Sequence, residues 1–139
     1  MPYKIFLIIY AVFYILAGCN HFLSTEGYYA IMPNWLPAHQ FLIYLSGVIE
    51  IILGVLLLFP KTRKQSALCI ILMLLAFMPA HIYMIQMAPF MLGKILVTPL
   101  IAWARLPFQL LFMGWAWYYF KNPKQKFYFN VSKQPTKGY

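Results

Sequence analysis

The chain has 139 residues, of which 63% are hydrophobic and 9% are charged, and its formal net charge is +9. This composition excludes a soluble globular domain and fits one compact membrane domain. The basic residues lie mainly in predicted loops and in the C-terminal tail, where the positive-inside rule explains them without a nucleic-acid partner.

Four apolar stretches are each long enough to cross a bilayer, which takes about 20 residues of helix. They cover residues 4–22, 37–59, 64–87 and 99–120. Pro37 suits the first position of a helix, and Thr98 suits the N-cap of the last one. Because every backbone polar group must be satisfied inside lipid, we expect an all-α, four-helix membrane bundle over residues 1–120.

The segment between the first two stretches is expected to be an ordered external loop. Residues 24–31 can form a short helix, and Met32-Pro33-Asn34-Trp35-Leu36-Pro37 follows it. Two prolines around Trp35 predict a stiff segment at the outer interface, where an aromatic ring is favoured. This segment is either a lid over the bundle or a simple interfacial anchor.

The distribution of basic residues predicts the orientation. Lys61, Arg63 and Lys64 lie between the second and third stretches, whereas residues 23–40 contain no Lys or Arg. Both termini are therefore expected to be cytoplasmic, in a multi-pass protein of the bacterial inner (plasma) membrane, with residues 121–139 as a basic cytoplasmic tail. The aromatic cluster Trp115, Trp117, Tyr118, Tyr119 and Phe120 then forms an anchor at the inner headgroups.

The run Leu16-Ala17-Gly18-Cys19 resembles a lipoprotein processing site. Its leader carries only Lys4, and no soluble domain follows, so we expect the first span to be retained. Cys19 and Cys69 are expected near opposite ends of their spans, beyond disulfide reach.

Polar side chains inside the apolar stretches mark the candidate site, because an ionisable group survives in a membrane only when it is paired or near water. These residues are Glu50, Arg105, His81, His21, Gln109, Ser46 and Asn20. Counted at 1.5 Å per residue, they lie about 13 to 24 Å from the cytoplasmic ends of their helices. Pro79 and Pro107 each remove a helical N–H and so free a carbonyl oxygen. The pattern predicts an outward-facing polar pocket, with Trp35 at its entrance.

Each of these residues also has a purely structural interpretation. Glu50 and Arg105 are expected to form an ion pair, which either stabilises the bundle or serves function. His21 and His81 can be interhelical hydrogen-bonding partners, and Ser46 and Asn20 can join helices. Two histidines and one carboxylate are a weak signal for a metal or a haem, so no metal site is expected.

Several motifs resemble the DoxX family of small four-span membrane proteins. They are Ala17-Gly18-x-x-His21-Phe22, Met32-Pro33-x-Trp35-Leu36-Pro37, Tyr44-Leu45-Ser46-Gly47-x-x-Glu50, Thr62-Arg63, Pro79-Ala80-x-Ile82-Tyr83-Met84 and Arg105-Leu106-Pro107-Phe108-Gln109. The resemblance implies a four-span fold and an association with membrane redox complexes, with quinone as the implied cofactor. Relatives that help other membrane proteins to assemble imply a second role.

The sequence thus favours an accessory component of a membrane redox system, which binds a quinone-like or other small amphipathic ligand. In this hypothesis Arg105, His81 and His21 donate to the ligand, while Glu50 holds Arg105 or relays a proton. The expected partners are the lipid bilayer and a membrane or redox protein. The main alternative is a non-catalytic assembly or scaffold protein; an intramembrane isomerase or hydrolase and a channel rank lower, and whether the protein is an enzyme stays open.

Overall fold

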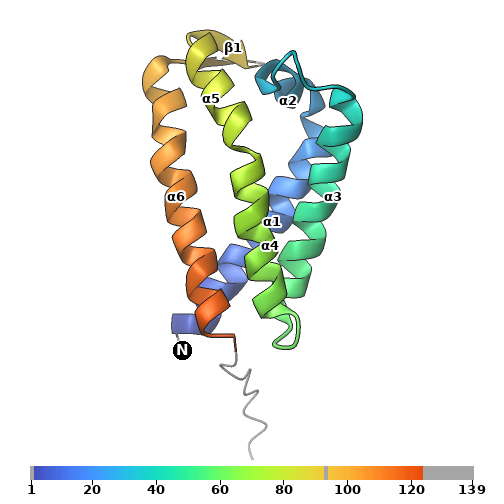
Figure 1. Ribbon diagram of the computed structural model, residues 1–139, viewed down its shortest axis with the longest axis vertical. Coiled ribbons are helices and arrows are strands. Elements are labelled where there is room, and N and C mark those ends of the chain that lie inside the picture. Colours follow the sequence, from blue (N-terminus) through green and yellow to red (C-terminus); the bar gives the residue numbers. More distant parts are fainter. Residues whose placement is uncertain (1, 93, 124–139) are drawn as a thin grey trace, which may run out of the picture.

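The computed structural model describes residues 2–92 and 94–123, and this part of the chain is mostly helical (Figure 1). The helices are α1 (Pro2–Leu23), α2 (Thr25–Ile31), α3 (His39–Leu58), α4 (Arg63–Ala76), α5 (Met78–Met87) and α6 (Pro99–Lys121). The strands β1 (Phe90–Leu92) and β2 (Ile95–Val97) form an antiparallel hairpin between α5 and α6, which the all-α prediction did not include. Most of the predicted tail lies outside the described residues.

Three helical segments are long and apolar enough to cross a membrane: Tyr3–Leu23, His39–Leu58 and Arg63–Met87, which joins α4 and α5. They correspond to the first three predicted spans. Helix α6 has 23 residues but is not among the three. It carries Arg105, Gln109 and several Trp and Tyr residues, which lower its hydropathy. The described chain therefore has the helices of a membrane protein.

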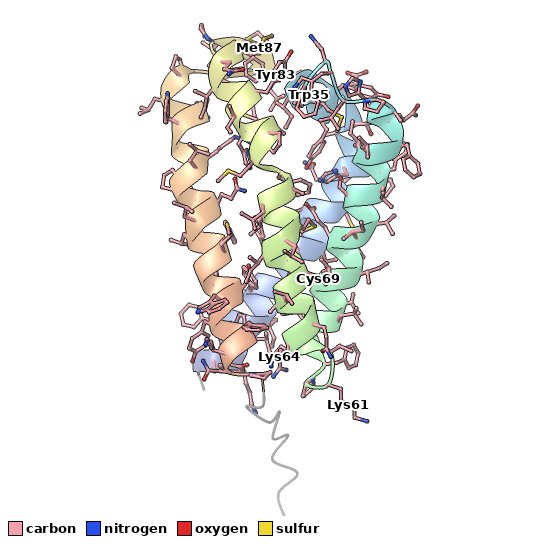
Figure 2. The ribbon with its side chains drawn as sticks, viewed as in Figure 1. Trp35, Lys61, Lys64, Cys69, Tyr83 and Met87 are labelled. Carbon is pink, nitrogen blue, oxygen red and sulfur yellow. The ribbon has the colours of Figure 1, made fainter. Side chains whose placement is uncertain are left out.

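The long helices run along the long axis of the molecule (Figure 1). The N-terminus, the turn from α3 to α4 and the end of α6 lie at one end, which we call the basal end. Helix α2 and the hairpin lie at the opposite end, which we call the apical end. Figure 2 shows Lys61 and Lys64 at the basal end, and Trp35, Tyr83 and Met87 at the apical end.

Two helix boundaries test the sequence-based signals. Thr98 caps α6 as predicted, because its hydroxyl accepts a hydrogen bond from the backbone N–H of Ile101 at 3.4 Å. The prediction for Pro37 is wrong, because α3 begins two residues later, at His39. Ala38 has a left-handed backbone with φ of 53°, which a helix cannot include. The preceding turn is held instead by Pro33, whose carbonyl accepts a bond from the His39 ring at 3.0 Å.

Helices α1 and α3 pack closely along a seam of small residues. A Cβ atom on Gly18 would lie 2.5 Å from the carbonyl oxygen of Gly47, and one on Gly54 would lie 2.8 Å from that of Ala11. Small residues let the two backbones approach, which is a common way to join helices in membranes. Gly18 therefore lies where α3 approaches α1 most closely among these contacts.

The basal end is organised around a buried arginine, not a fully exposed basic turn. Lys61 and Lys64 are exposed, but Arg63 is 0% exposed. Its guanidinium donates to the carbonyl oxygens of Leu57, Leu58 and Pro123 at 3.0, 3.0 and 2.9 Å. Arg63, one of the basic residues of the turn, thus joins the C-terminal ends of α3 and α6.

The aromatic cluster near the end of α6 contains both exposed and buried residues. Trp117 and Tyr118 are exposed, as an interfacial anchor requires, but Tyr119 is 0% exposed and packs in the core. The core there includes Tyr10, whose hydroxyl donates to the carbonyl of Phe112 at 2.7 Å. Part of the predicted anchor therefore stabilises the contact between α1 and α6.

Candidate functional site

A cavity of about 380 Å³ lies between the long helices, with residues of α2 also in its wall. Six of the eight predicted site residues line it: His21, Ser46, Glu50, His81, Arg105 and Gln109. The rest of the wall is mainly aromatic and aliphatic and includes Phe13, Tyr14, Tyr28, Phe77, Phe108 and Phe112. The fold therefore brings most of the polar residues of the apolar stretches to one place.

Two predicted site residues lie outside the cavity wall. Asn20 donates through its side-chain amide to the hydroxyl of Tyr28 at 3.1 Å, so it contacts a lining residue without lining the cavity itself. Trp35 is 71% exposed and lies at the apical end (Figure 2). The residues near it that do line the cavity are Ile31 and Met32.

Glu50 pairs with His21 rather than with Arg105, which corrects the predicted ion pair. The Nε2 atom of His21 lies 3.4 Å from Oε2 of Glu50, and both side chains are almost fully buried. No ion pair between Glu50 and Arg105 is present among the described residues. The difference arises because residues on α1 and α3 meet at the glycine seam, which brings His21 against α3.

The contacts of His21 indicate where its proton lies. Its Nδ1 atom is 3.0 Å from the carbonyl oxygen of Ile43, which can only accept, so Nδ1 is the donor. The hydroxyl of Ser46 donates to the same carbonyl at 2.9 Å and lies 3.1 Å from Nδ1. The Nε2 atom, on the other side of the ring, faces the Glu50 carboxylate.

Gln109 joins α6 to the break between α4 and α5. Its Nε2 atom donates to the carbonyl oxygen of Leu74, at the end of α4. The helix is interrupted at Phe77, two residues before Pro79, because proline supplies no N–H and crowds the preceding turn. This bond also fixes the orientation of the amide, so Oε1 is the other atom, and it has no hydrogen-bond partner within the described part of the chain.

His81 and Arg105 contribute a second polar wall, from α5 and α6. The Nδ1 atom of His81 is buried and has no hydrogen-bond partner in residues 2–92 and 94–123, and the same holds for Oε2 of Glu50. Arg105 is partly buried and lies within electrostatic range of His81 and Tyr28. Buried polar atoms usually have hydrogen-bond partners, so these two atoms, of which Oε2 of Glu50 has only the ion-pair contact with His21, point to a polar ligand or to water.

Tyr28 is the main lining residue that the sequence analysis missed. Its ring stacks on the imidazole of His21, with ring centroids 3.8 Å apart. Burial raises the pKa of the Tyr28 hydroxyl, its hydrogen bond with Asn20 lowers it, and the charges of Glu50 and Arg105 act in opposite directions. The available signal was the spacing of Tyr28 and Ile31, which lie on one face of the short helix α2.

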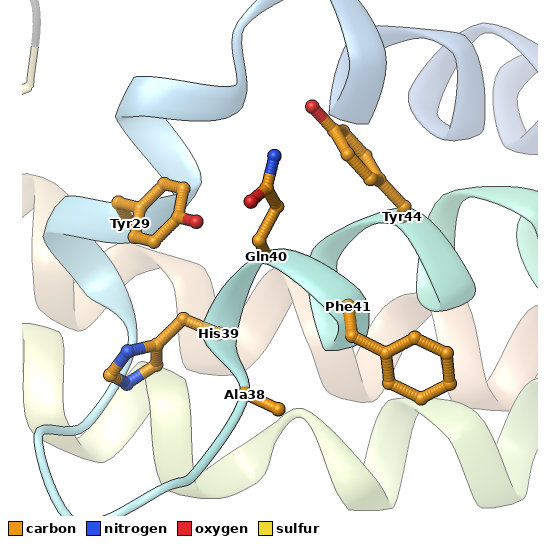
Figure 3. Close-up of a pocket in the computed structure, with 6 residues that line it drawn as sticks. All are labelled: Tyr29, Ala38, His39, Gln40, Phe41 and Tyr44. Carbon is orange, nitrogen blue, oxygen red and sulfur yellow. The ribbon is translucent and has the colours of Figure 1, made fainter.

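A second, shallower depression of about 580 Å³ lies at the apical end of α3 (Figure 3). It is lined by Tyr29, Ala38, His39, Gln40, Phe41 and Tyr44, none of which is a predicted site residue. Among the described residues, no three His, Cys, Asp or Glu side chains come together as a set of metal ligands. The cavity that contains His21 and Glu50 is therefore the candidate site.

The fold and the cavity together define a helical protein with membrane-length apolar helices around a polar and aromatic site. Residues 10–120 match the family described as "Domain of unknown function (DUF8561)", and the chain belongs to this family. The matched segment contains every residue that lines the cavity. No curated protein and no solved structure matches the chain.

Proposed function

We propose that this protein is an accessory component of a membrane redox system that binds a small amphipathic, quinone-like molecule in the cavity. The observation that carries the proposal is the meeting of ionisable and amide side chains in one largely aromatic cavity. Binding sites for small molecules usually have volumes of about 300–1,000 Å³, with apolar walls and a few polar groups. Intramembrane ionisable residues are by default candidates for function.

The residues present fit a quinone-like ring. The hydroxyl of Tyr28 accepts a bond from Asn20, which leaves its own proton free to donate to a ligand carbonyl. Oε1 of Gln109 has no hydrogen-bond partner among the described residues and can accept from a ligand hydroxyl, and Oε2 of Glu50, which faces His21, can also accept. The surrounding aromatic side chains supply faces and edges for ring packing. A bound quinone would supply electron transfer, while these residues would bind and orient it.

The redox assignment draws on the resemblance to the DoxX family. Its most specific motifs are Ser46-Gly47-x-x-Glu50 and Arg105-x-Pro107-x-Gln109, and their polar members all line the cavity. The resemblance supports a role beside a membrane or redox protein partner. It also supports a four-span bundle with an ordered external loop.

In the proposed topology, α6 is the fourth span. Its 23 residues extend for about 35 Å at 1.5 Å per residue, which is enough to cross a bilayer core. Lys61, Lys64 and Lys121 belong to the basal end, whereas Lys94 lies in the apical hairpin. We assign the basal end and both termini to the cytoplasmic side of a bacterial inner membrane, with the cavity facing outward.

The first experiment is to purify the protein in mild detergent and identify the small molecules that it carries by absorbance and mass spectrometry. A stoichiometric quinone-like ligand is expected. The Glu50→Gln variant should lose it, because one carboxylate oxygen becomes an amide N–H. The matched control is Glu26→Gln, which makes the same change at an exposed position of α2 outside the cavity. Equal ligand content in both variants would contradict the proposal.

A second candidate is a non-catalytic assembly or scaffold protein. It is favoured by the hydrogen bonds that tie helices together through the same residues, from Gln109 to Leu74 and from His21 to Ile43. In this case the purified protein carries a protein partner and no ligand. Substitution of Glu50 should then reduce folding rather than ligand content, and circular dichroism distinguishes the two results.

A further inference from the structure

Arg105 has no acidic side chain as a partner among the described residues. The sequence contains two acidic side chains, Glu26 and Glu50, and both belong to the described residues. Glu50 pairs with His21, and Glu26 is exposed on α2 and does not line the cavity. A guanidinium is permanently charged, and no acidic side chain compensates the charge of Arg105.

Among the residues that line the cavity, Arg105 is the one whose side chain is permanently charged. The Glu50 carboxylate faces His21, where α1 and α3 meet, and makes no ion pair with Arg105. His81 is either neutral or positive. Arg105 places a positive charge in the wall of a largely apolar cavity, where an uncompensated charge is costly and electrostatic attraction is strong.

Two more side chains that can donate accompany Arg105, and each comes from a different element. Tyr28 of α2 accepts from Asn20 at 3.1 Å, which leaves its own O–H free. His81 of α5 has a buried Nδ1 atom without a partner among the described residues. All three side chains line the same cavity. Donors from three elements around one space form the usual arrangement for binding an oxyanion, because charge-assisted hydrogen bonds are the strongest.

We propose that Arg105, Tyr28 and His81 bind the anionic head group, a carboxylate or a phosphate, of a single-chain amphiphile. The apolar chain lies against the aromatic wall that includes Phe77, Phe108 and Phe112. A cavity of about 380 Å³ suits a ligand with one alkyl chain rather than a lipid with two. This inference rests on the proposed amphiphile binding and specifies the charge of the ligand.

The test measures the binding of radiolabelled dodecanoate to the full chain in nanodiscs of neutral lipid, with empty nanodiscs as the blank. The pH is chosen so that the carboxylate is ionised, and dodecanol is the neutral comparison. Dodecanoate should bind stoichiometrically and at least about 10-fold more tightly than dodecanol. Dodecyl phosphate and inorganic phosphate, run in parallel, distinguish a lipid phosphate from a free anion.

Arg105→Gln should weaken dodecanoate binding by about 10- to 100-fold, as expected for the loss of charge-assisted hydrogen bonds. Arg105→Lys, which keeps the charge, should retain part of the affinity, and Tyr28→Phe should weaken it less than Arg105→Gln does. Lys61→Gln is the charge-matched control, because Lys61 is exposed at the basal end (Figure 2). If circular dichroism shows that Arg105→Gln does not fold, the loss of dodecanoate affinity is measured with Arg105→Lys and Tyr28→Phe instead.

Each result decides between the two proposals. Binding of dodecyl phosphate with the same sensitivity to Arg105 supports the inference and identifies the head group as a phosphate. If only inorganic phosphate binds, the inference is overturned, because the protein then does not recognise the alkyl chain of the ligand. If dodecanoate and dodecanol bind equally well, the proposal of an anionic head group is overturned, but the proposal of amphiphile binding stands. If neither binds, both proposals fail.

Discussion

Arg63 allows a sharp test of how the basal end is held together. Its guanidinium makes three hydrogen bonds of about 3 Å with backbone carbonyls of Leu57, Leu58 and Pro123. Each hydrogen bond to a charged group contributes about 1.5–3 kcal/mol to stability. When Arg63 is removed, water can reach the carbonyl oxygens at the helix ends and restore part of that stabilisation. Arg63→Met should therefore lower the free energy of unfolding by about 3–5 kcal/mol, the range for breaking a buried charged network.

The assay is reversible denaturant unfolding in mixed micelles, followed by circular dichroism. Lys61→Met is the matched control, because it removes a positive charge two residues away from an exposed position. It should change the free energy of unfolding by less than about 0.5 kcal/mol. Arg63→Lys should give an intermediate loss, since an ammonium cannot reproduce the planar fork. A loss below about 1 kcal/mol for Arg63→Met would refute the reasoning, because exposed positions give similar values.

Two further predictions concern packing between helices. Gly18→Ala places a Cβ atom 2.5 Å from the carbonyl of Gly47 and should destabilise the protein by about 1–3 kcal/mol. Gly114→Ala is its control, because no atom lies within 4 Å of the added Cβ, and it should stabilise α6 by up to about 1 kcal/mol in the same unfolding assay. Gln109→Leu removes the bond to Leu74 and should cost about 1–3 kcal/mol, measured as a shift in thermal unfolding. An unchanged melting temperature would show that this bond does not hold α6 to α4.

The positions of the helices follow from local properties of the chain, which is why the sequence predicted them well. Long apolar runs and the N-cap at Thr98 located α1, α6 and most of the others. The break near Pro79 was also predictable, because the missing N–H is a property of the residue itself. The start of α3 was not, since Ala38 adopts its left-handed backbone in response to the turn held by His39 and Pro33.

The pairing of polar side chains could not be read from the sequence. Depth estimates placed Glu50 and Arg105 in the same region, and opposite charges made their pairing the natural expectation. Pairing also depends on how each helix is rotated about its axis and on which neighbour it meets. The glycine seam sets the rotation of α1 and α3 and makes them neighbours, and Glu50 therefore meets His21.

The sequence by itself determined the helical class, the membrane-length apolar segments and the residues that cannot lie in lipid unpaired. These depend on composition and on spacing along one helix. Only the tertiary structure decided that Arg63 is buried among carbonyls, that Tyr28 lines the cavity and that Arg105 lacks an acidic partner. The reason is that side chains far apart in sequence meet only after the helices have packed, and their partners depend on that packing.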